Sequence, residues 1–165
     1  RSLIGYNTDY FGAKKVIEKT LDIRGKYVLM LGAGGVAKAI GHAVKDLGGV
    51  LCISNRNEEK GRKLAVDLKS NFLQFEKLYD GGGKLFINST SLGMNWEEIP
   101  HSNEIVDNFD YVMDVIIGET KLTELAKRKG KIVIPGRKMT VYQAAEQFKI
   151  YTKRELPESF LEEFL

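Results

Sequence analysis

The feature that most constrains the fold is a glycine-rich turn between an apolar strand and a helix. The stretch YVLMLG, from Tyr27 to Gly32, is short, continuous and apolar, as is typical of a buried strand in a parallel sheet. LGAGGVAKA overlaps its end, so that Gly32, Gly34 and Ala37 have the spacing of a dinucleotide-binding turn. Gly32 permits the tight turn, Gly34 lets a pyrophosphate approach the backbone, and Ala37 keeps the helix close to the sheet.

The helix that follows this turn offers an anion site at its tip, because its first N–H groups lack partners within the helix and the helix dipole is positive there. We therefore predict that a dinucleotide binds along Gly32, Ala33, Gly34, Gly35 and Val36. Two other interpretations stay open: a strand–helix turn that binds no ligand, and the glycine loop of a methyltransferase. A nucleotide-triphosphate P-loop is excluded, because the chain has no Gly-Lys-Ser/Thr sequence.

Apolar strands alternate with segments of helical periodicity along the chain. We predict strands at 27–32, 50–55, 72–75, 84–90, 111–116 and 131–136, and helices at 10–21, from the glycine turn to 48, at 58–68, 120–129 and 138–151, and after 157. This alternation makes β-α-β units. It predicts a three-layer, doubly wound α/β fold with a mainly parallel six-stranded sheet, the Rossmann fold. The length of 165 residues suits a single domain, 1–165.

The end of the second strand indicates which dinucleotide would bind. NAD-preferring sites usually have Asp or Glu there, bonded to the ribose 2′-hydroxyl. This chain instead has SNRN, with Asn55, Arg56 and Asn57. A guanidinium can bind a 2′-phosphate through two hydrogen bonds, whereas a carboxylate would repel it. We therefore predict NADP as the cofactor, with these three residues in its site; a solvated surface arginine is the alternative.

Composition argues against several functional classes. The net charge of +3, without a run of like charges, gives no basis for nucleic-acid binding. No apolar run approaches the ~20 residues of a membrane span. The single cysteine, Cys52, excludes an intrachain disulfide and fits a cytoplasmic location. His42 and His101 lack the spacing of metal ligands, so we predict no metal site.

Several motifs together resemble those of the shikimate dehydrogenase family. They are GYNTDYFG, LGAGGVAKA, SNRN, INSTSLGM and GRKMTVYQAAEQF, in the order and at the spacings of that family, over essentially the whole chain. The resemblance is to the C-terminal, NADP-binding part of an enzyme that interconverts shikimate and 3-dehydroshikimate in aromatic amino acid biosynthesis. It implies an NADP-dependent oxidoreductase as the full-length protein.

The resemblance implies a catalytic and substrate-binding role for Asp9. In the family this aspartate pairs with a lysine, and both contact substrate hydroxyls while hydride passes to or from the nicotinamide. A carboxylate beside an ammonium holds it in place and shifts its pKa, as acid–base chemistry requires. A structural role is compatible with this: Asp9 can cap the first helix, although Asn7 or Thr8 can do so equally well.

Other family positions fall in the later segments. Gln143 matches a substrate-binding glutamine, with a polar position on an amphipathic helix as the alternative. Ile117 stands at a substrate position where the family often has tyrosine, which leaves room for a relative acting on quinate or another ring acid. The family also implies cofactor contacts, for which a plain loop and core packing are the structural alternatives, at Thr90, Val115, Gly136 and Met139.

The family's catalytic lysine and serine-rich substrate site belong to an N-terminal domain. We therefore expect this chain, which begins with Arg1, to be a fragment that binds cofactor but catalyses little alone. Segments 1–21 and 138–165 would border the missing domain and expose apolar residues. The expected partners are the small-molecule substrate, that domain, and a second copy in a homodimer.

Two other functions compete with this interpretation. One is a stand-alone NADP-binding or sensing module, which would not need Asp9 and Gln143. The other is a two-domain dehydrogenase acting on folate or on an activated glutamate, which would lack the combination of NTD and INSTSLGM.

Overall fold

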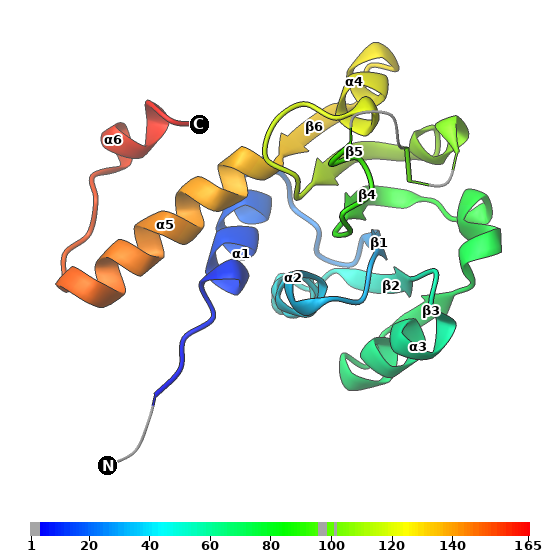
Figure 1. The fold of residues 1–165 in the computed structure, drawn as a ribbon, viewed down its shortest axis with the longest axis horizontal. Helices are drawn as coiled ribbons and strands as arrows, with labels where there is room; N and C mark the ends of the chain where they lie inside the picture. Colours follow the sequence, from blue (N-terminus) through cyan, green and yellow to red (C-terminus); the bar gives the residue numbers. More distant parts are fainter. Residues whose placement is uncertain (1–3, 96–98, 101) are drawn as a thin grey trace.

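The computed structural model describes residues 4–95, 99–100 and 102–165 and contains one six-stranded, all-parallel sheet (Figure 1). The strand order is β3-β2-β1-β4-β5-β6, which is the order of the doubly wound dinucleotide fold. The strands are β1 (Tyr27–Leu31), β2 (Val50–Ser54), β3 (Asn71–Leu73), β4 (Gly83–Asn88), β5 (Phe109–Asp114) and β6 (Ile132–Pro135). The predicted fold class is confirmed.

Helices cover both faces of the sheet. They are α1 (Thr8–Thr20), α2 (Gly35–Asp46), α3 (Glu58–Asp67), α4 (Lys121–Arg128), α5 (Gly136–Thr152) and α6 (Glu158–Glu162), with 3₁₀ helices η1 (Phe75–Asp80) and η2 (Asn103–Val106). Side chains of β1 alternate between two cores: Val28 and Met30 face one, Leu29 and Leu31 the other. The first core packs against α1, α2, α3 and α5, and the second against α4, η1 and η2. The three predicted layers are therefore present.

The predicted elements differ from the observed ones mainly at their ends. The last long helix begins at Gly136 rather than near Lys138, because Pro135 ends β6 and is itself the N-cap of α5. The two 3₁₀ helices were not predicted, since such short helices show no periodicity in sequence. The predicted residue His101 lies outside the described residues.

Helices α1 and α5 lie side by side, and α5 extends beyond the sheet toward α6 (Figure 1). The Gln147 side-chain amide donates a hydrogen bond to the Thr8 hydroxyl (3.3 Å). One turn further along α1, Gly12 lies directly against the backbone and side chain of Gln143. The first turns of α1 therefore rest on the middle of α5.

Candidate cofactor and substrate site

The carboxyl ends of β1 and β2 meet at the glycine turn. Gly32 has a φ of 123°, which glycine adopts without steric cost, and its N–H donates to the Ser54 carbonyl (2.9 Å). A Cβ at Gly32 would lie 2.4 Å from Ser89 Oγ, at the end of β4. The chain thus leaves the neighbouring strands β1 and β4 toward opposite faces of the sheet. This is the topological switch point at which open α/β sheets bind ligands.

The N-terminus of α2 is open to an incoming anion. Its N-cap is Gly34, no side chain caps it, and its first turn has no acidic residue. Added Cβ atoms at Gly34 and Gly35 would meet nothing within 4 Å. The free N–H groups and the positive end of the helix dipole therefore face accessible space. Ala33 and Val36, which flank the two glycines, pack partly against the core.

The loop after β2 holds its asparagines in place and leaves its arginine available. The Asn55 amide donates to the Asn57 carbonyl (2.8 Å). Asn57 is the N-cap of α3, and its Oδ1 accepts a hydrogen bond from the Lys60 N–H (2.9 Å). Arg56 is exposed and forms no hydrogen bond or ion pair with any residue that the structure describes. Its guanidinium is therefore available to an anionic ligand, one strand away from the tip of α2.

A buried polar network joins the ends of β4 and β5. Asp114 Oδ1 accepts hydrogen bonds from the Asn88 amide (3.1 Å) and from the Ile116 N–H (3.2 Å). Asp114 Oδ2 accepts one from the Thr120 hydroxyl (2.8 Å). Asn88 Oδ1 in turn accepts from the Thr90 N–H (3.2 Å) and the Thr90 hydroxyl (2.7 Å). Asn88 and Asp114 are fully buried, so the network is held away from solvent.

Burial is the main cause that raises the pKa of Asp114 above its ordinary value. The hydrogen bonds from Thr120, Ile116 and Asn88 act in the opposite direction, because they favour the ionised carboxylate. No Lys or Arg among the described residues pairs with Asp114. Neutral donors alone therefore stabilise the charge of this carboxylate.

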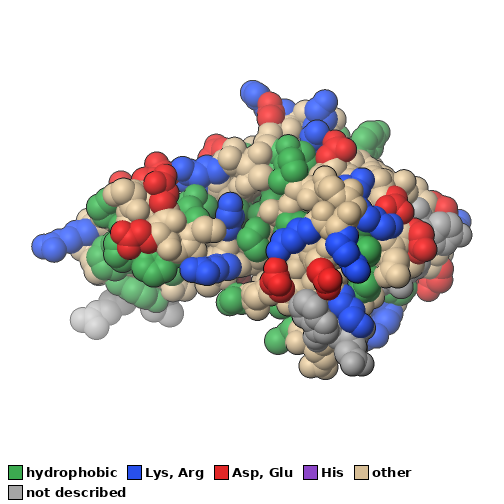
Figure 2. All heavy atoms as spheres, turned by 90° about the horizontal axis from the view of Figure 1, so that it is seen from above, with side chains coloured by type: hydrophobic (Ala, Val, Ile, Leu, Met, Phe, Trp, Pro, Cys, Tyr) green, Lys and Arg blue, Asp and Glu red, His purple; other side chains and the backbone are tan. Residues whose placement is uncertain are grey.

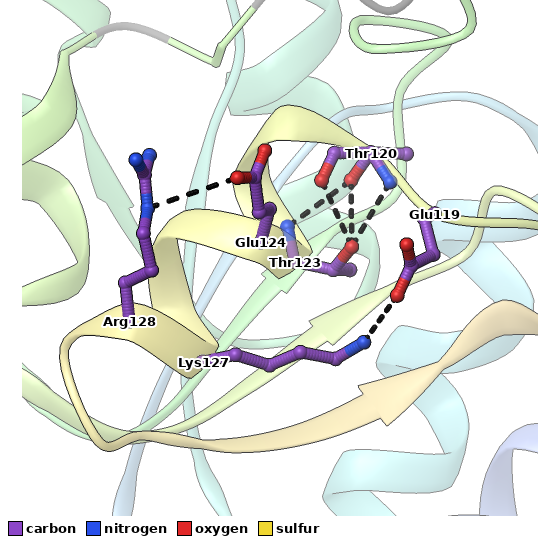
Figure 3. A network of polar contacts seen from close by, with 6 residues as sticks. All are labelled: Glu119, Thr120, Thr123, Glu124, Lys127 and Arg128. Carbon is purple, nitrogen blue, oxygen red and sulfur yellow. Dashed lines mark hydrogen bonds and ion pairs between the residues drawn. The ribbon is translucent and has the colours of Figure 1, made fainter.

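The start of α4 completes the network through Thr120, whose hydrogen bonds with Thr123 are drawn in Figure 3. Thr120 is the N-cap of α4 and forms a capping box with Thr123, in which each N–H donates to the other hydroxyl (2.9 and 3.2 Å). On the outer side, Lys127 pairs with Glu119 (2.5 Å). The same Thr120 hydroxyl that caps the helix also holds Asp114. The beginning of α4 is therefore tied to the ends of β4 and β5.

The start of α5 is in backbone contact with the loop after β5. A Cβ at Gly136 would lie 2.4 Å from the Val115 carbonyl oxygen and 2.5 Å from that of Ile116, so only glycine fits here. The Val115 N–H donates to the Asn88 carbonyl (3.1 Å). Met139 is 5% exposed and belongs to the core beside this contact. Val115, Gly136 and Met139 are therefore brought together near the end of β5.

Asn7, rather than Asp9, caps α1. The Asn7 Oδ1 accepts a hydrogen bond from the Tyr10 N–H (3.3 Å). Asp9 lies half-buried in the first turn, and its predicted role does not compete with capping. A Cβ at Gly12, one turn further, would lie 3.1 Å from the Gln143 Cβ. Asp9 and Gln143, two of the three residues predicted to bind substrate, therefore come from adjoining parts of the α1–α5 contact.

A cavity of about 500 Å³ connects the start of α1 with the start of α2. It is lined by Asn7, Tyr10, Gly35, Lys38, Ala39, His42 and Asp46. The Tyr10 hydroxyl donates to Asp46 Oδ2 (2.6 Å), and the Lys14 ammonium donates to the Tyr10 oxygen (3.3 Å). The hydrogen bond to Asp46 is the main cause that raises the pKa of Tyr10. These contacts fix the helix that carries Asp9 against the helix that follows the glycine turn.

Ile117 lies in the loop between β5 and α4 and is 67% exposed. It contributes an apolar surface where a tyrosine would contribute a hydroxyl.

The described ranges, 4–95, 99–100 and 102–165, contain no group of three or more His, Cys, Asp or Glu residues arranged to hold a metal ion. Within the same ranges no helix is both long and apolar enough to span a bilayer.

Sequence reasoning missed two contacts of the site. The first is the network around Asp114, whose one signal was an acidic residue at the end of an otherwise apolar strand, YVMD. A carboxylate in such a position is rarely buried without partners. The second is the hydrogen bond between Tyr10 and Asp46, which are too far apart in sequence for any local pattern to join them.

No protein-family model matches the chain. The shikimate dehydrogenase (NADP(+)) of Archaeoglobus fulgidus is 36% identical over 160 residues, which covers 91% of this chain and 59% of that protein. That of Methanothrix thermoacetophila is 35% identical over 167 residues, covering 98% and 62%. The crystal structure of the Aquifex aeolicus enzyme matches with a TM-score of 0.86 and 34% identity, over 96% of this chain and 60% of that one.

This chain is a homologue of the shikimate dehydrogenases. It spans only about three fifths of the length of these shikimate dehydrogenases (59% and 62% in the two curated proteins). The shikimate dehydrogenase of Thermus thermophilus, solved in complex with NADP(H) and shikimate, is 26% identical and matches with a TM-score of 0.84 over 96% of this chain. The resemblance predicted from the motifs is thus confirmed.

Proposed function

We propose that residues 1–165 are the NADP-binding domain of an oxidoreductase that interconverts shikimate and 3-dehydroshikimate. The observation that carries the proposal is the uncapped tip of α2, open at Gly34 and Gly35, with the unpaired Arg56 one strand away. The helix tip suits a pyrophosphate, and the guanidinium suits a 2′-phosphate. The homologous Thermus thermophilus enzyme, whose crystal structure contains NADP(H) and shikimate, supports this choice of ligands.

The residues at the other end of the site would receive the nicotinamide. Bound NADP supplies the hydride acceptor, and NADPH the donor. In an open α/β sheet the dinucleotide crosses the switch point, so that its two halves lie over opposite halves of the sheet. With the 2′-phosphate at Arg56 after β2, the nicotinamide half would lie over the ends of β4 and β5. That half of the site contains Thr90, Val115, Gly136 and, in the adjoining core, Met139.

Asp9 and Gln143 would bind the hydroxyl groups of the substrate. Asp9 is not used as the helix cap, and no described residue forms an ion pair with it. Its carboxylate can accept a hydrogen bond from a substrate hydroxyl, and it can form an ion pair with a lysine ammonium supplied from outside this chain. The lysine would move the proton, so we propose that this chain alone turns over little or no shikimate.

The α1–α5–α6 face would receive the domain that carries this lysine. A groove of about 700 Å³ runs between the three helices, with Phe11, Tyr142, Leu156 and Leu161 among its lining residues and lysines and glutamates at its rim. Figure 2 shows hydrophobic side chains on the surface of the left-hand lobe, which contains α6 and the end of α5.

We also propose that the protein is located in the cytoplasm, which its single cysteine fits, and that it forms a homodimer.

Titration of the chain with NADP and NAD in parallel tests the cofactor. We expect the chain to bind NADP more tightly than NAD. We expect Arg56→Ala to lower the affinity for NADP by about tenfold or more and to change the affinity for NAD little, because one charge-assisted contact is lost. The matched control is Arg128→Ala, which removes an exposed arginine from α4. Equal affinities for the two nucleotides, or an equal loss of both in Arg56→Ala, would contradict the proposed 2′-phosphate contact.

An NADP-linked assay with shikimate, on this chain and on the full-length protein, tests the activity. We expect turnover only in the full-length protein, and we expect Asp9→Asn to abolish it there without changing the affinity for NADP. Ordinary turnover by the isolated chain would refute the role of an external lysine.

A quinate-type relative is the second candidate, favoured by the exposed Ile117. The same assay with quinate distinguishes the two, since a higher kcat/KM for quinate would favour it.

A further inference from the structure

Asp114 is a buried carboxylate to which the proposed reaction gives no task. Burying a charge without a cation costs free energy even when hydrogen bonds compensate, and an apolar residue of similar size is often better for stability alone. Leu85, Phe86 and Ile87 fill neighbouring positions of β4 with apolar side chains. A carboxylate at this position therefore indicates that its particular hydrogen bonds have a role other than stability.

Those hydrogen bonds have a fixed direction. An ionised carboxylate only accepts, so the Asn88 amide group that faces Asp114 must be the NH₂. The same NH₂ also donates to the Leu92 carbonyl (3.0 Å), which leaves the Asn88 oxygen to accept both hydrogen bonds from Thr90. Asp114 and the Leu92 carbonyl thus orient the Asn88 amide, and the Asn88 oxygen in turn orients Thr90.

The second loop is held by both oxygens of the carboxylate, Oδ1 at Ile116 and Oδ2 at Thr120. Asp114 accepts one hydrogen bond from the Ile116 N–H and another from the hydroxyl of Thr120, where α4 begins. The segment between these two contacts carries Ile117, and the residue before Ile116 is Val115, which contacts Gly136. One carboxylate therefore sets the loops that follow both β4 and β5.

We propose that Asp114 is a positioning residue that holds Thr90 and Val115 against the nicotinamide half of the cofactor; this rests on the proposed NADP-dependent function. Asp114 is buried and touches neither cofactor nor substrate directly. The adenosine half, bound at Arg56 and the tip of α2, lies on the other side of the switch point and is independent of it.

Two ligands separate the halves of the site. Adenosine 2′,5′-bisphosphate occupies only the adenosine half, whereas NADPH occupies both and its nicotinamide fluorescence reports on the environment of that ring. We expect Asp114→Asn to bind adenosine 2′,5′-bisphosphate within about twofold of the unmodified chain, since that half is unchanged. At saturating NADPH we expect the variant to lose most of the fluorescence change, and NADP to bind about tenfold more weakly.

A second variant covers the case in which Asp114→Asn does not fold. Thr120→Val removes the hydroxyl that donates to the carboxylate and caps α4, and Thr120→Ser restores both contacts. We expect the same loss of the NADPH signal in Thr120→Val, smaller in size, and its recovery in Thr120→Ser. Lys127→Ala, which removes only the exposed ion pair with Glu119, is the control.

The outcomes are distinct. A folded Asp114→Asn or Thr120→Val variant with an unchanged NADPH signal overturns the positioning role. The role is also overturned if a variant loses affinity for adenosine 2′,5′-bisphosphate and for NADPH to the same extent. If the unmodified chain binds neither ligand, the proposed function itself fails and the inference falls with it.

Discussion

Two glycines of the same turn are required for different physical reasons. Gly32 is fixed by the protein itself, since its φ of 123° and the nearby Ser89 Oγ leave no room for a side chain. Gly34 has an ordinary φ of −87° and open space where a Cβ would be. Nothing within the described residues demands glycine at 34, whereas a close pyrophosphate would. This difference favours the ligand-binding interpretation over a turn that binds nothing.

We therefore expect Gly34→Ala to leave stability nearly unchanged. We expect it to lower the affinity for NADP by at least about tenfold, because the alanine methyl group would occupy the position of the phosphate. Gly32→Ala should instead lower the free energy of unfolding by about 1–3 kcal/mol, from strain at a positive φ. Urea unfolding and NADP titration of both variants check this. Unimpaired NADP binding by Gly34→Ala would favour the turn without ligand.

At the scale of elements, the site depends on how α1 is held against α2. The hydrogen bond of the Tyr10 hydroxyl to Asp46 spans the two helices (2.6 Å). Asp9 precedes Tyr10, and α2 begins at the glycine turn. The helix–helix contact therefore sets the proposed catalytic carboxylate relative to the proposed phosphate site.

We expect Tyr10→Phe to reduce the free energy of unfolding by about 1 kcal/mol, the usual net value of one hydrogen bond. NADP affinity of the chain should not change, because the glycine turn is intact, whereas kcat of the full-length protein should fall. Tyr6→Phe, at an exposed tyrosine before α1, is the matched control. If both variants have the same stability, the hydrogen bond contributes nothing measurable in solution.

At the scale of the whole molecule, α6 is the element with the least support. None of its residues is buried: Leu161 packs only partly against the main core, and Glu158 forms an exposed ion pair with Lys19. Exposed ion pairs contribute little to stability. Large exposed hydrophobic side chains gather on and near this part of the chain: Phe11, Tyr151, Phe160 and Phe164. A covering domain would bury this surface.

Hydrogen exchange on this chain and on the full-length protein tests that expectation. We expect the amides of α6 to exchange rapidly in the isolated chain, since a helix without buried residues opens readily. In the full-length protein they should become protected, while exchange in α3, which lies beside the edge strand β3 and away from α6, stays the same (Figure 1). Equal exchange of α6 in both proteins would argue against its docking role.

Much of the fold could be predicted from local patterns. The apolar run of β1 and the glycine spacing after it each depend on a few consecutive residues, and the alternation of strands and helices allows few topologies. The proposed site residues could be named, but mostly through a family resemblance. Gln143 and Met139 alone look like ordinary positions of a helix, and Ile117 like any loop residue.

The sequence by itself determined the six strands, the α-helices and the fold class, and it predicts a phosphate-binding turn, because these follow from periodicity and from backbone freedom at glycine. Only the tertiary structure decided that Asn7 leaves Asp9 free, that Tyr10 bonds Asp46, and that Asp114 orients Asn88. The last two contacts join residues 36 and 26 positions apart. Their distances and burial depend on how the helices and strands pack, and no local pattern encodes that packing.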